Sequence, residues 1–320
     1  MNLVDISELT VSFRQHEGLV QAVRGISLRV DAGESVGIVG ESGSGKSVTC
    51  MAMLRLLREP PARITAGKFE IAGTDILRAD NRTLASLRGR VAAMVFQDPM
   101  TAFDPVFTIG HQIIETIRTH RNVSKAEARA EAESLLRRVE IKQAKDVLGY
   151  YPHQLSGGML QRAMIAMALS CRPQILLADE PTTALDVTIQ AQILQLIKEL
   201  QAEFGMSLIM VTHDLGVIAE TVDRVVVMYG GRVMEQGPVE AIFDDPRHPY
   251  TQALLRSIPG HAGGRRRLTE IKGASPNPAN PPTGCPFHPR CAAAESACRE
   301  SMPVMVAVGA RHDAACWRLQ

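Results

Sequence analysis

A glycine- and serine-rich turn at residues 40–47 lies between a short apolar run at 35–39 and a segment at 48–54 whose apolar residues have helical spacing. This order predicts a strand, a tight turn and a helix. The glycines let successive backbone N–H groups curl around an anion, and the helix N-terminus adds the positive end of its dipole. The turn therefore predicts a site for a nucleoside triphosphate.

The last two residues of the turn carry the most specific chemistry. Lys46 is placed to reach the β- and γ-phosphates, and the Ser47 hydroxyl is placed to bind Mg²⁺. An ordinary Gly/Ser loop is the alternative, but the strand before the turn and the helix after it argue against it. The residues that we expect to contact the nucleotide here are Gly40, Ser42, Gly43, Ser44, Gly45, Lys46, Ser47 and Thr49.

Length and charge bound the class of protein. The 320 residues suffice for a sizeable core and a second, smaller unit. The net charge is only +1, from 35 Lys and Arg against 34 Asp and Glu, so no global field attracts nucleic acid or an anionic membrane. The N-terminus lacks the basic start and apolar stretch of a secretory leader, and no run of eighteen apolar residues occurs. We therefore expect a cytosolic chain that does not itself span a membrane.

The segment before the glycine-rich turn has β character. Short β-rich runs at 9–13 and 26–30 are joined by turn-forming residues, and they predict an antiparallel flank beside the phosphate-binding core. Phe13 lies where an adenine ring can stack on it. A core-facing strand residue is an equally good interpretation of this side chain.

From about residue 98 to residue 170 the apolar spacing becomes helical, with a charged amphipathic stretch at 124–139. Because this block separates the phosphate loop from the next strand, we expect a helical subdomain inserted into an α/β core. Gln97 lies just before it, in a turn after a strand, where it can contact a metal ion or an attacking water. A solvated turn residue is the other interpretation.

A further apolar run at 174–178 ends in Asp179 and Glu180. Its β-rich residues do not alternate with polar ones, which favours a parallel strand covered on both faces. Two acids at the end of such a strand are costly without a cation or water nearby, and Mg²⁺ at the phosphate loop supplies that cation. We expect Asp179 to hold the metal through its hydration shell and Glu180 to polarise the attacking water.

Two weaker signals complete the candidate site. Ser156 and Gly158 begin a helix and form a second possible anion site, although serine is also an ordinary helix N-cap. His213 follows an apolar strand at 207–211, at the carboxyl edge where open α/β sheets build their sites.

Taken together and in order, these motifs resemble the ATP-binding subunit of an ABC transporter over residues 1 to about 235. The resemblance implies an α/β P-loop NTPase core with an antiparallel β flank and an inserted helical subdomain, forming an ATPase domain at 1–258. It implies that Phe13 stacks on adenine, where many members have Tyr. Gln97 is then the residue that senses nucleotide and transporter, with Ser47 and Asp179 beside it at Mg²⁺, and Glu180 is the catalytic base or positions the water.

The same resemblance implies a composite site. Ser156 and Gly158 bind the γ-phosphate of the nucleotide held by a partner subunit, while Asp186 and His213 complete the arrangement. Met159 stands where the common signature has Gln, a departure that the peptide-importer branch shares. One chain alone is therefore not expected to form a working site.

Four of the six cysteines lie in the last 36 residues, and in a reducing cytosol this crowding favours metal over disulfides. They are Cys285, Cys291, Cys298 and Cys316. The five, six and seventeen intervening residues differ from the short pairs of common zinc fingers. The segment at 259–284 has linker composition. We expect it to separate a Cys-rich region at 285–320 from the ATPase.

The tail also carries a resemblance. Residues 236–255 resemble the segment that follows the ATPase in di- and oligopeptide importers, and the four cysteines resemble the [4Fe–4S] tail of dipeptide-importer ATPases. Zinc, with His288 as a possible ligand, and unliganded thiols remain the alternatives. The implied cofactors are ATP, Mg²⁺ and a [4Fe–4S] cluster in a small metal-bound C-terminal extension.

The resemblance implies an ATPase that powers peptide import from the cytoplasmic face of the bacterial inner membrane. The implied partners are a second, related ATPase, two membrane-spanning permease subunits that dock near residues 97–107, and an extracytoplasmic binding protein, with no nucleic acid. An importer ATPase for nickel or another small solute is one alternative. A soluble ABC ATPase acting on DNA or the ribosome is another, which the lack of sustained heptads and of overall basic charge argues against.

Overall fold

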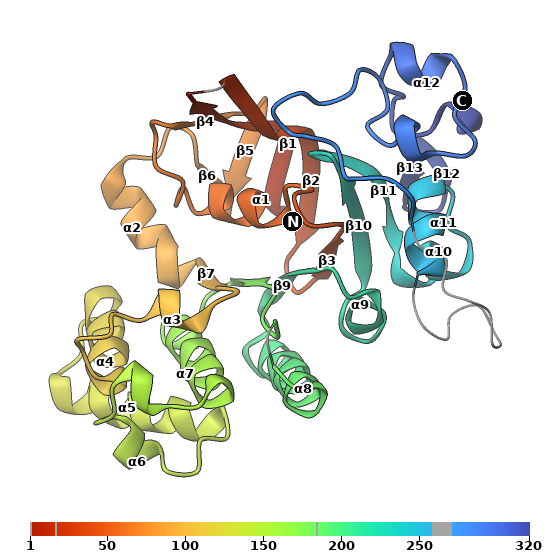
Figure 1. Cartoon of the computed structure of the whole chain (residues 1–320). Coiled ribbons are helices and arrows are strands. Elements are labelled where there is room, and N and C mark those ends of the chain that lie inside the picture. The colour runs from red at the N-terminus through yellow and green to blue at the C-terminus, as the bar shows by residue number, and fades with distance from the viewer. Residues whose placement is uncertain (1, 17, 184, 258–270) are drawn as a thin grey trace. The chain divides into compact units, whose positions relative to one another are not determined.

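The structure is a computed structural model that describes residues 2–16, 18–183, 185–257 and 271–320. The chain folds into two compact units (Figure 1). The first unit contains residues 1–78 and 210–320, and the second contains residues 79–209. Ala184 and the first part of the predicted linker, residues 259–270, lie outside the described residues.

The strands are β1 Asn2–Gln15, β2 Gly18–Asp31, β3 Ser35–Val39, β4 Ala62–Thr65, β5 Lys68–Ile71, β6 Thr74–Asp75, β7 Ala92–Val95, β8 Ile175–Asp179, β9 Ser207–Thr212, β10 Arg224–Tyr229, β11 Arg232–Pro238, β12 Val306–Gly309 and β13 His312–Ala314. The α-helices are α1 Lys46–Met53, α2 Asn81–Arg90, α3 Pro99–Ala102, α4 Ile109–His120, α5 Lys125–Arg138, α6 Ala144–Val147, α7 Gly157–Leu169, α8 Val187–Phe204, α9 Leu215–Thr221, α10 Val239–Asp244, α11 Pro249–Arg256 and α12 Ala297–Glu300. Short 3₁₀ turns are η1 Pro152–Gln154, η2 His288–Arg290 and η3 Trp317–Leu319.

The antiparallel flank predicted at the N-terminus is present in the first unit. A sheet runs in the order β2-β1-β5-β6, with β4 also paired to β1. The strands β1 and β2 are much longer than the predicted runs at 9–13 and 26–30, and their register shifts at several points. Because β1 is paired along both edges, its polar residues are held in the sheet without an apolar signal of their own.

A second set of strands in the first unit carries the phosphate loop. The five residues of β3 are all buried, and β3 pairs in parallel with β10, as the unbroken apolar pattern of 35–39 indicates. The strand β10 pairs antiparallel with β11. The helix α9 packs so closely on β3 that a Cβ atom at Gly37 would lie 2.6 Å from Ile218 Cδ1.

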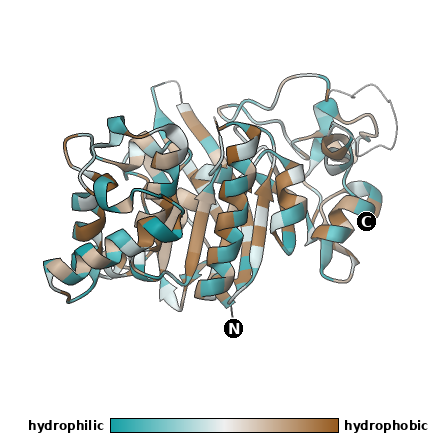
Figure 2. Ribbon diagram, turned by 90° about the horizontal axis from the view of Figure 1, so that it is seen from below, coloured by the Kyte–Doolittle hydropathy of each residue, from teal (hydrophilic) through white to brown (hydrophobic). Residues whose placement is uncertain are grey.

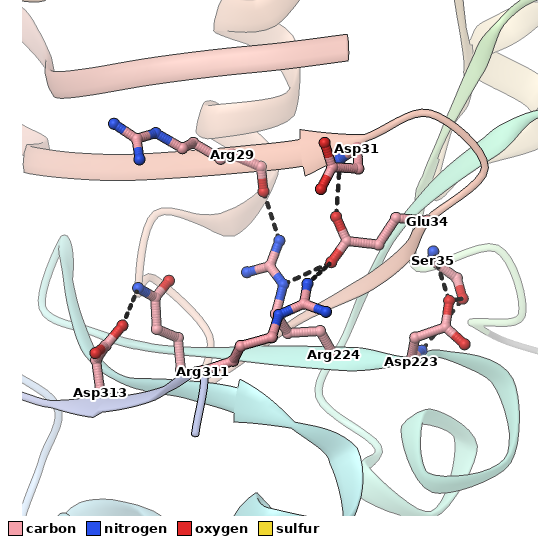
Figure 3. A network of polar contacts seen from close by, with 9 residues as sticks. Arg29, Asp31, Glu34, Ser35, Asp223, Arg224, Arg311 and Asp313 are labelled. Atoms are coloured by element: carbon pink, nitrogen blue, oxygen red, sulfur yellow. Dashed lines mark hydrogen bonds and ion pairs between the residues drawn. The ribbon is translucent and has the colours of Figure 1, made fainter. Parts of the chain in front are cut away.

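Polar contacts fasten the beginning of β3 to β10. Asp223 accepts hydrogen bonds from the backbone N–H of Ser35 at 2.9 Å and from its hydroxyl. Arg224 donates from Nε to Glu34 at 2.7 Å, in an ion pair whose side chains are both largely buried. Arg311, from the C-terminal hairpin, lies 3.7 Å from the same carboxylate (Figure 3). The strand that leads into the phosphate loop is therefore fixed at its start.

The second unit contains helices in the range where the sequence predicts a helical insert. Helices α3 to α7 fall between residues 99 and 169, followed by the buried strand β8, which pairs in parallel with β7. The longer helices carry both hydrophobic and hydrophilic residues (Figure 2), and α4 buries Ile109, Ile113 and Ile117. Ser124 and Glu127 form a reciprocal capping box at the start of α5.

The Cys-rich region belongs to the same compact unit as the phosphate loop, although the sequence predicts a separate region beyond a linker. Its strand β13 extends the sheet by pairing antiparallel with β11. His312 Nε2 lies 2.8 Å from Glu235 Oε1, and both side chains are buried. Because the hairpin β12–β13 joins the sheet through β11, the region packs against the unit instead of standing apart (Figure 1).

No helix within the described ranges is both long and apolar enough to cross a lipid bilayer.

Candidate nucleotide-binding site

The phosphate loop connects β3 to α1, as predicted. Gly43 and Gly45 have φ angles of +79° and +101°, in the region that favours glycine. A Cβ atom at Gly45 would lie 2.5 Å from the Ala22 carbonyl oxygen, and one at Gly40 would lie 2.1 Å from that of Met228. The glycines are therefore required both by backbone conformation and by close approach of neighbouring strands.

Lys46 and Ser44 are already directed into this loop. The buried Lys46 ammonium donates to the carbonyl oxygens of Gly40 at 2.7 Å and Glu41 at 3.0 Å. The buried Ser44 Oγ has no hydrogen-bond partner among the described residues. A buried hydroxyl without a partner is costly, and a phosphate oxygen would satisfy it. The donor set therefore fits a polyphosphate. Thr49 instead donates its hydroxyl to the carbonyl oxygen of Gly45, the N-cap of α1.

The other candidate residues of the first unit lie on a strand or directly after one. Phe13 is half-buried on β1, where it pairs with Val20 of β2 and Ala62 of β4. His213 is exposed directly after β9, before Asp214, which caps α9. Both placements agree with the sequence prediction. Each side chain can also be interpreted as purely structural, Phe13 as a residue of the sheet and His213 as a residue that ends a strand.

In the second unit, Gln97 and Glu180 come together although 83 residues separate them. Gln97 Nε2 donates to Glu180 Oε2 at 3.0 Å, and Thr183 Oγ1 donates to the same oxygen at 2.8 Å. Glu180 has a φ of 45°, a left-handed conformation that is strained for a non-glycine residue. Asp179 is buried at the end of β8. Thr183 was missed by sequence reasoning, since a threonine near a turn has no distinctive signal.

The predicted signature residues lie beside a large open pocket in the second unit. Ser156 is the N-cap of α7, and Asp186 caps α8 by accepting from the Ile189 N–H at 2.9 Å. Gly158 is tightly packed, because a Cβ atom there would lie 3.2 Å from Ile189 Cγ2. The pocket, of about 1210 Å³, is lined by Ser156 and Gly158, by the cationic residues Arg137, Lys142, Lys145 and Arg162, and by the acidic residues Glu140 and Asp146. Arg162 forms an ion pair with Glu140 at 2.8 Å. The four cations outnumber the two acids, so the lining favours an anion, and these cations were not predicted from sequence.

The same unit exposes three large apolar side chains close to one another in sequence. Met100, Val106 and Phe107 are 46%, 68% and 44% exposed. They lie in and after α3, directly beyond Gln97. Exposed apolar side chains gathered in this way are typical of a docking surface.

The four C-terminal cysteines line one small pocket, together with His248, Phe287 and His288. Burial raises the pKa of the Cys285 thiol to about 11 and also raises the pKa values of the Cys291 and Cys316 thiols. Within the described part of the chain, no three His, Cys, Asp or Glu side chains are arranged to hold a metal ion. The thiols therefore converge, but not in the arrangement of a site for one ion.

Comparison with known proteins agrees with this geometry. Residues 23–183 match the family described as ABC transporter, and residues 234–298 match the oligopeptide/dipeptide transporter, C-terminal region. The dimeric structure of a post-hydrolysis state of the ATP-binding cassette MJ0796, bound to ADP and Pi, is 30% identical with a TM-score of 0.67, over 74% of this chain and 98% of that chain.

Two curated relatives extend over nearly the whole chain. The probable peptide ABC transporter ATP-binding protein y4tR of Sinorhizobium fredii is 49% identical, over 99% of this chain and 95% of the relative. The dipeptide transport ATP-binding protein DppD of Haemophilus influenzae is 47% identical, over 97% and 94%. The chain is thus an ABC transporter ATPase. Within that class it belongs to the dipeptide/oligopeptide importer family.

Proposed function

We propose that this chain hydrolyses ATP to power the import of dipeptides and oligopeptides across a bacterial inner membrane, acting as a peripheral subunit on its cytoplasmic face. The observation that carries the proposal is the nearly full-length relationship to a dipeptide transport ATPase, which includes the C-terminal region. A phosphate loop with a buried lysine and an unsatisfied buried hydroxyl supplies the site for ATP.

The residues of this chain divide the work of hydrolysis. Lys46 and the loop N–H groups bind the β- and γ-phosphates, and Phe13 supports the adenine ring. Ser47, Asp179 and Gln97 would hold Mg²⁺, which neutralises the charge that develops on the transferred phosphoryl group. The Glu180 carboxylate orients the attacking water and accepts its proton, while Gln97 and Thr183 hold that carboxylate in place.

The remaining candidates act across a dimer of ATPases. Ser156 and Gly158 bind the γ-phosphate of the nucleotide on the partner subunit, and the nearby cations attract it. Asp186 and His213 complete the composite site. We propose a related but distinct chain as the partner, with no role for nucleic acid. The exposed Met100, Val106 and Phe107 support docking of two membrane-spanning permease subunits beside Gln97, and an extracytoplasmic binding protein delivers the peptide.

We also propose that Cys285, Cys291, Cys298 and Cys316 bind one [4Fe–4S] cluster. Their convergence on one pocket supports this proposal, together with the resemblance of their spacing to the tail of dipeptide-importer ATPases. The cluster would supply a covalent staple for a region with few large apolar residues. Binding would release the thiol protons.

Peptide transport is tested in proteoliposomes that contain the assembled permease and both ATPases. We expect ATP-dependent uptake of a labelled dipeptide when its binding protein is added, and no uptake with Lys46→Ala. Uptake of nickel but not of peptides would contradict the proposed cargo and leave the ATPase activity unaffected.

The cluster has its own test in the anaerobically purified protein. We expect about four irons and four acid-labile sulfides per chain, and loss of both in Cys291→Ser. One zinc per chain, without iron, would contradict the cluster.

A further inference from the structure

We propose that the Cys-rich region positions the phosphate loop through Arg290, so that ATP affinity depends on the state of this region. The proposal rests on the function proposed above in taking the loop as the ATP site, and its test also takes the four cysteines as the iron site. It concerns Glu41, the second residue of the loop, and a clamp of tail residues around it. All of these residues belong to the first unit.

Glu41 is held through three different groups. Its N–H donates to the Tyr250 hydroxyl at 3.0 Å, and its carbonyl oxygen accepts from Lys46 Nζ at 3.0 Å. Its carboxylate accepts from Arg290 at 2.7 Å and from the Ser275 hydroxyl. Two of these partners, Ser275 and Arg290, come from the region after residue 270. The tail therefore contacts a residue whose own carbonyl binds the phosphate-loop lysine.

Arg290 is a buried clamp with four acceptors. Its side chain is only 8% exposed. Besides Glu41, it donates to the Tyr229 hydroxyl at 3.0 Å and to the carbonyl oxygens of Lys272 at 3.0 Å and Ile271 at 2.9 Å. Its guanidinium also lies over the Tyr229 ring, 5.7 Å from the centroid. A planar guanidinium can donate to all four acceptors at once, whereas a lysine ammonium can donate to only some of them.

The residues that Arg290 holds continue as a strap along the nucleotide site. Pro276 packs beside Gly230, in the β10–β11 turn whose next residue, Gly231, donates to the Ser44 carbonyl at 3.1 Å. Pro278 accepts from the Gln21 N–H at 2.9 Å. Gln21 is the partner of Ser12 on β1, next to Phe13. The strap therefore contacts the phosphate loop and also the strand pair that carries Phe13.

Charge gives the clamp its effect on binding. The Glu41 carboxylate is three-quarters buried, and its negative charge opposes that of the phosphates unless Arg290 neutralises it. An unneutralised carboxylate would also attract the Lys46 ammonium away from the nucleotide. Arg290 directly precedes Cys291 and ends the turn η2, so whatever binds Cys291 fixes the backbone that carries the guanidinium. The Cys-rich region can thereby set the affinity of the loop.

The test is a double-mutant cycle in the assembled complex, read out as the equilibrium dissociation constant of a non-hydrolysable ATP analogue. We expect Arg290→Ala to weaken binding by about tenfold or more, because it leaves a mostly buried carboxylate unpaired. Glu41→Gln removes the charge that needs pairing, so the double variant should recover most of the affinity. Arg290→Lys should recover part of it. Arg299→Ala, an exposed change in the same region, is the control and should bind as the wild type does.

Iron content, measured on each variant, separates loss of the clamp from loss of the whole region. If Arg290→Ala keeps its iron and binds the analogue as tightly as the wild type, the proposal is wrong. If Arg290→Ala loses its iron, the double variant decides, because a merely structural defect is not suppressed by Glu41→Gln. Wild-type binding of the analogue without peptide uptake would contradict the proposed cargo and leave this inference intact.

Discussion

At the scale of single residues, Lys46 shows how the loop is prepared for its ligand. Its ammonium is buried and held by two carbonyl oxygens of its own loop. Lys46→Ala removes the cation that would turn to the β- and γ-phosphates, and we expect ATP binding to weaken about ten- to a hundredfold. Equilibrium binding measures this change, with the exposed Lys125→Ala as the control. Normal ATPase activity of Lys46→Ala in the assembled complex would contradict the assignment.

For Glu180, a single substitution can separate a role in catalysis from a role in nucleotide binding. Glu180→Gln keeps the shape of the side chain but cannot accept a proton from water. We expect nucleotide affinity to be retained and kcat to fall by about two to four powers of ten. Separate measurement of kcat and of the dissociation constant checks this, with the exposed Glu115→Gln as a matched control. An equal loss of affinity would show that Glu180 has a structural role.

At the scale of elements, the contact of β3 with α9 supports the strand that leads into the phosphate loop. Gly37→Ala would place a Cβ atom 2.6 Å from Ile218 Cδ1 and 3.1 Å from Val222 Cγ2. We expect the free energy of unfolding to fall by about 1–3 kcal/mol, the usual cost of overpacking a core. Urea unfolding measures it.

Ile218→Val removes the nearest clashing atom, so in combination with Gly37→Ala it should cost less than the sum of the two single changes. If the two changes in the free energy of unfolding add exactly, the crowding at residue 37 is relieved at a place other than Ile218.

At the scale of the whole molecule, acid stability depends on a buried histidine. His248 caps α11 by accepting from the Tyr250 N–H at 3.0 Å, and burial lowers its pKa to about 3. In the unfolded chain the imidazole binds a proton near pH 6.5, so between about pH 6.5 and pH 3 the unfolded state holds more protons. The free energy of unfolding should therefore fall as the pH falls, by at most about 1.4 kcal/mol per pH unit from this group.

His248→Asn removes the titration and keeps a good N-cap. Urea midpoints at several pH values between 7 and 4 should show a shallower pH dependence in the variant than in the wild type. The carboxylates titrate in the same way in both proteins, so the difference between the two curves comes from His248. Parallel curves would show that the imidazole is not kept neutral by burial.

Local pattern in the sequence was sufficient for several parts of this protein. The glycines, Lys46 and Ser47 have a spacing that only a strand, a tight turn and a helix satisfy, so their placement followed without tertiary information. The helical block after Gln97 and the buried strand before Asp179 were predictable for the same reason, because apolar periodicity reflects which face is buried. The lengths of the N-terminal strands could not be predicted in this way, because pairing along both edges of β1 keeps residues in the sheet that have no apolar pattern.

Only the tertiary structure decided which distant residues meet. Gln97 and Thr183 converge on Glu180, and Arg290 reaches Glu41 across 249 residues. These contacts leave no local trace, because an arginine before a cysteine or a threonine in a turn is ordinary sequence. Likewise, the linker composition before Cys285 predicts separation, whereas pairing of β13 with β11 and burial of the Glu235–His312 pair join the Cys-rich region to the unit of the phosphate loop. Burial of hydrogen-bonded polar pairs and of sheet edges depends on what the folded chain brings alongside them, and a sequence pattern does not contain that information.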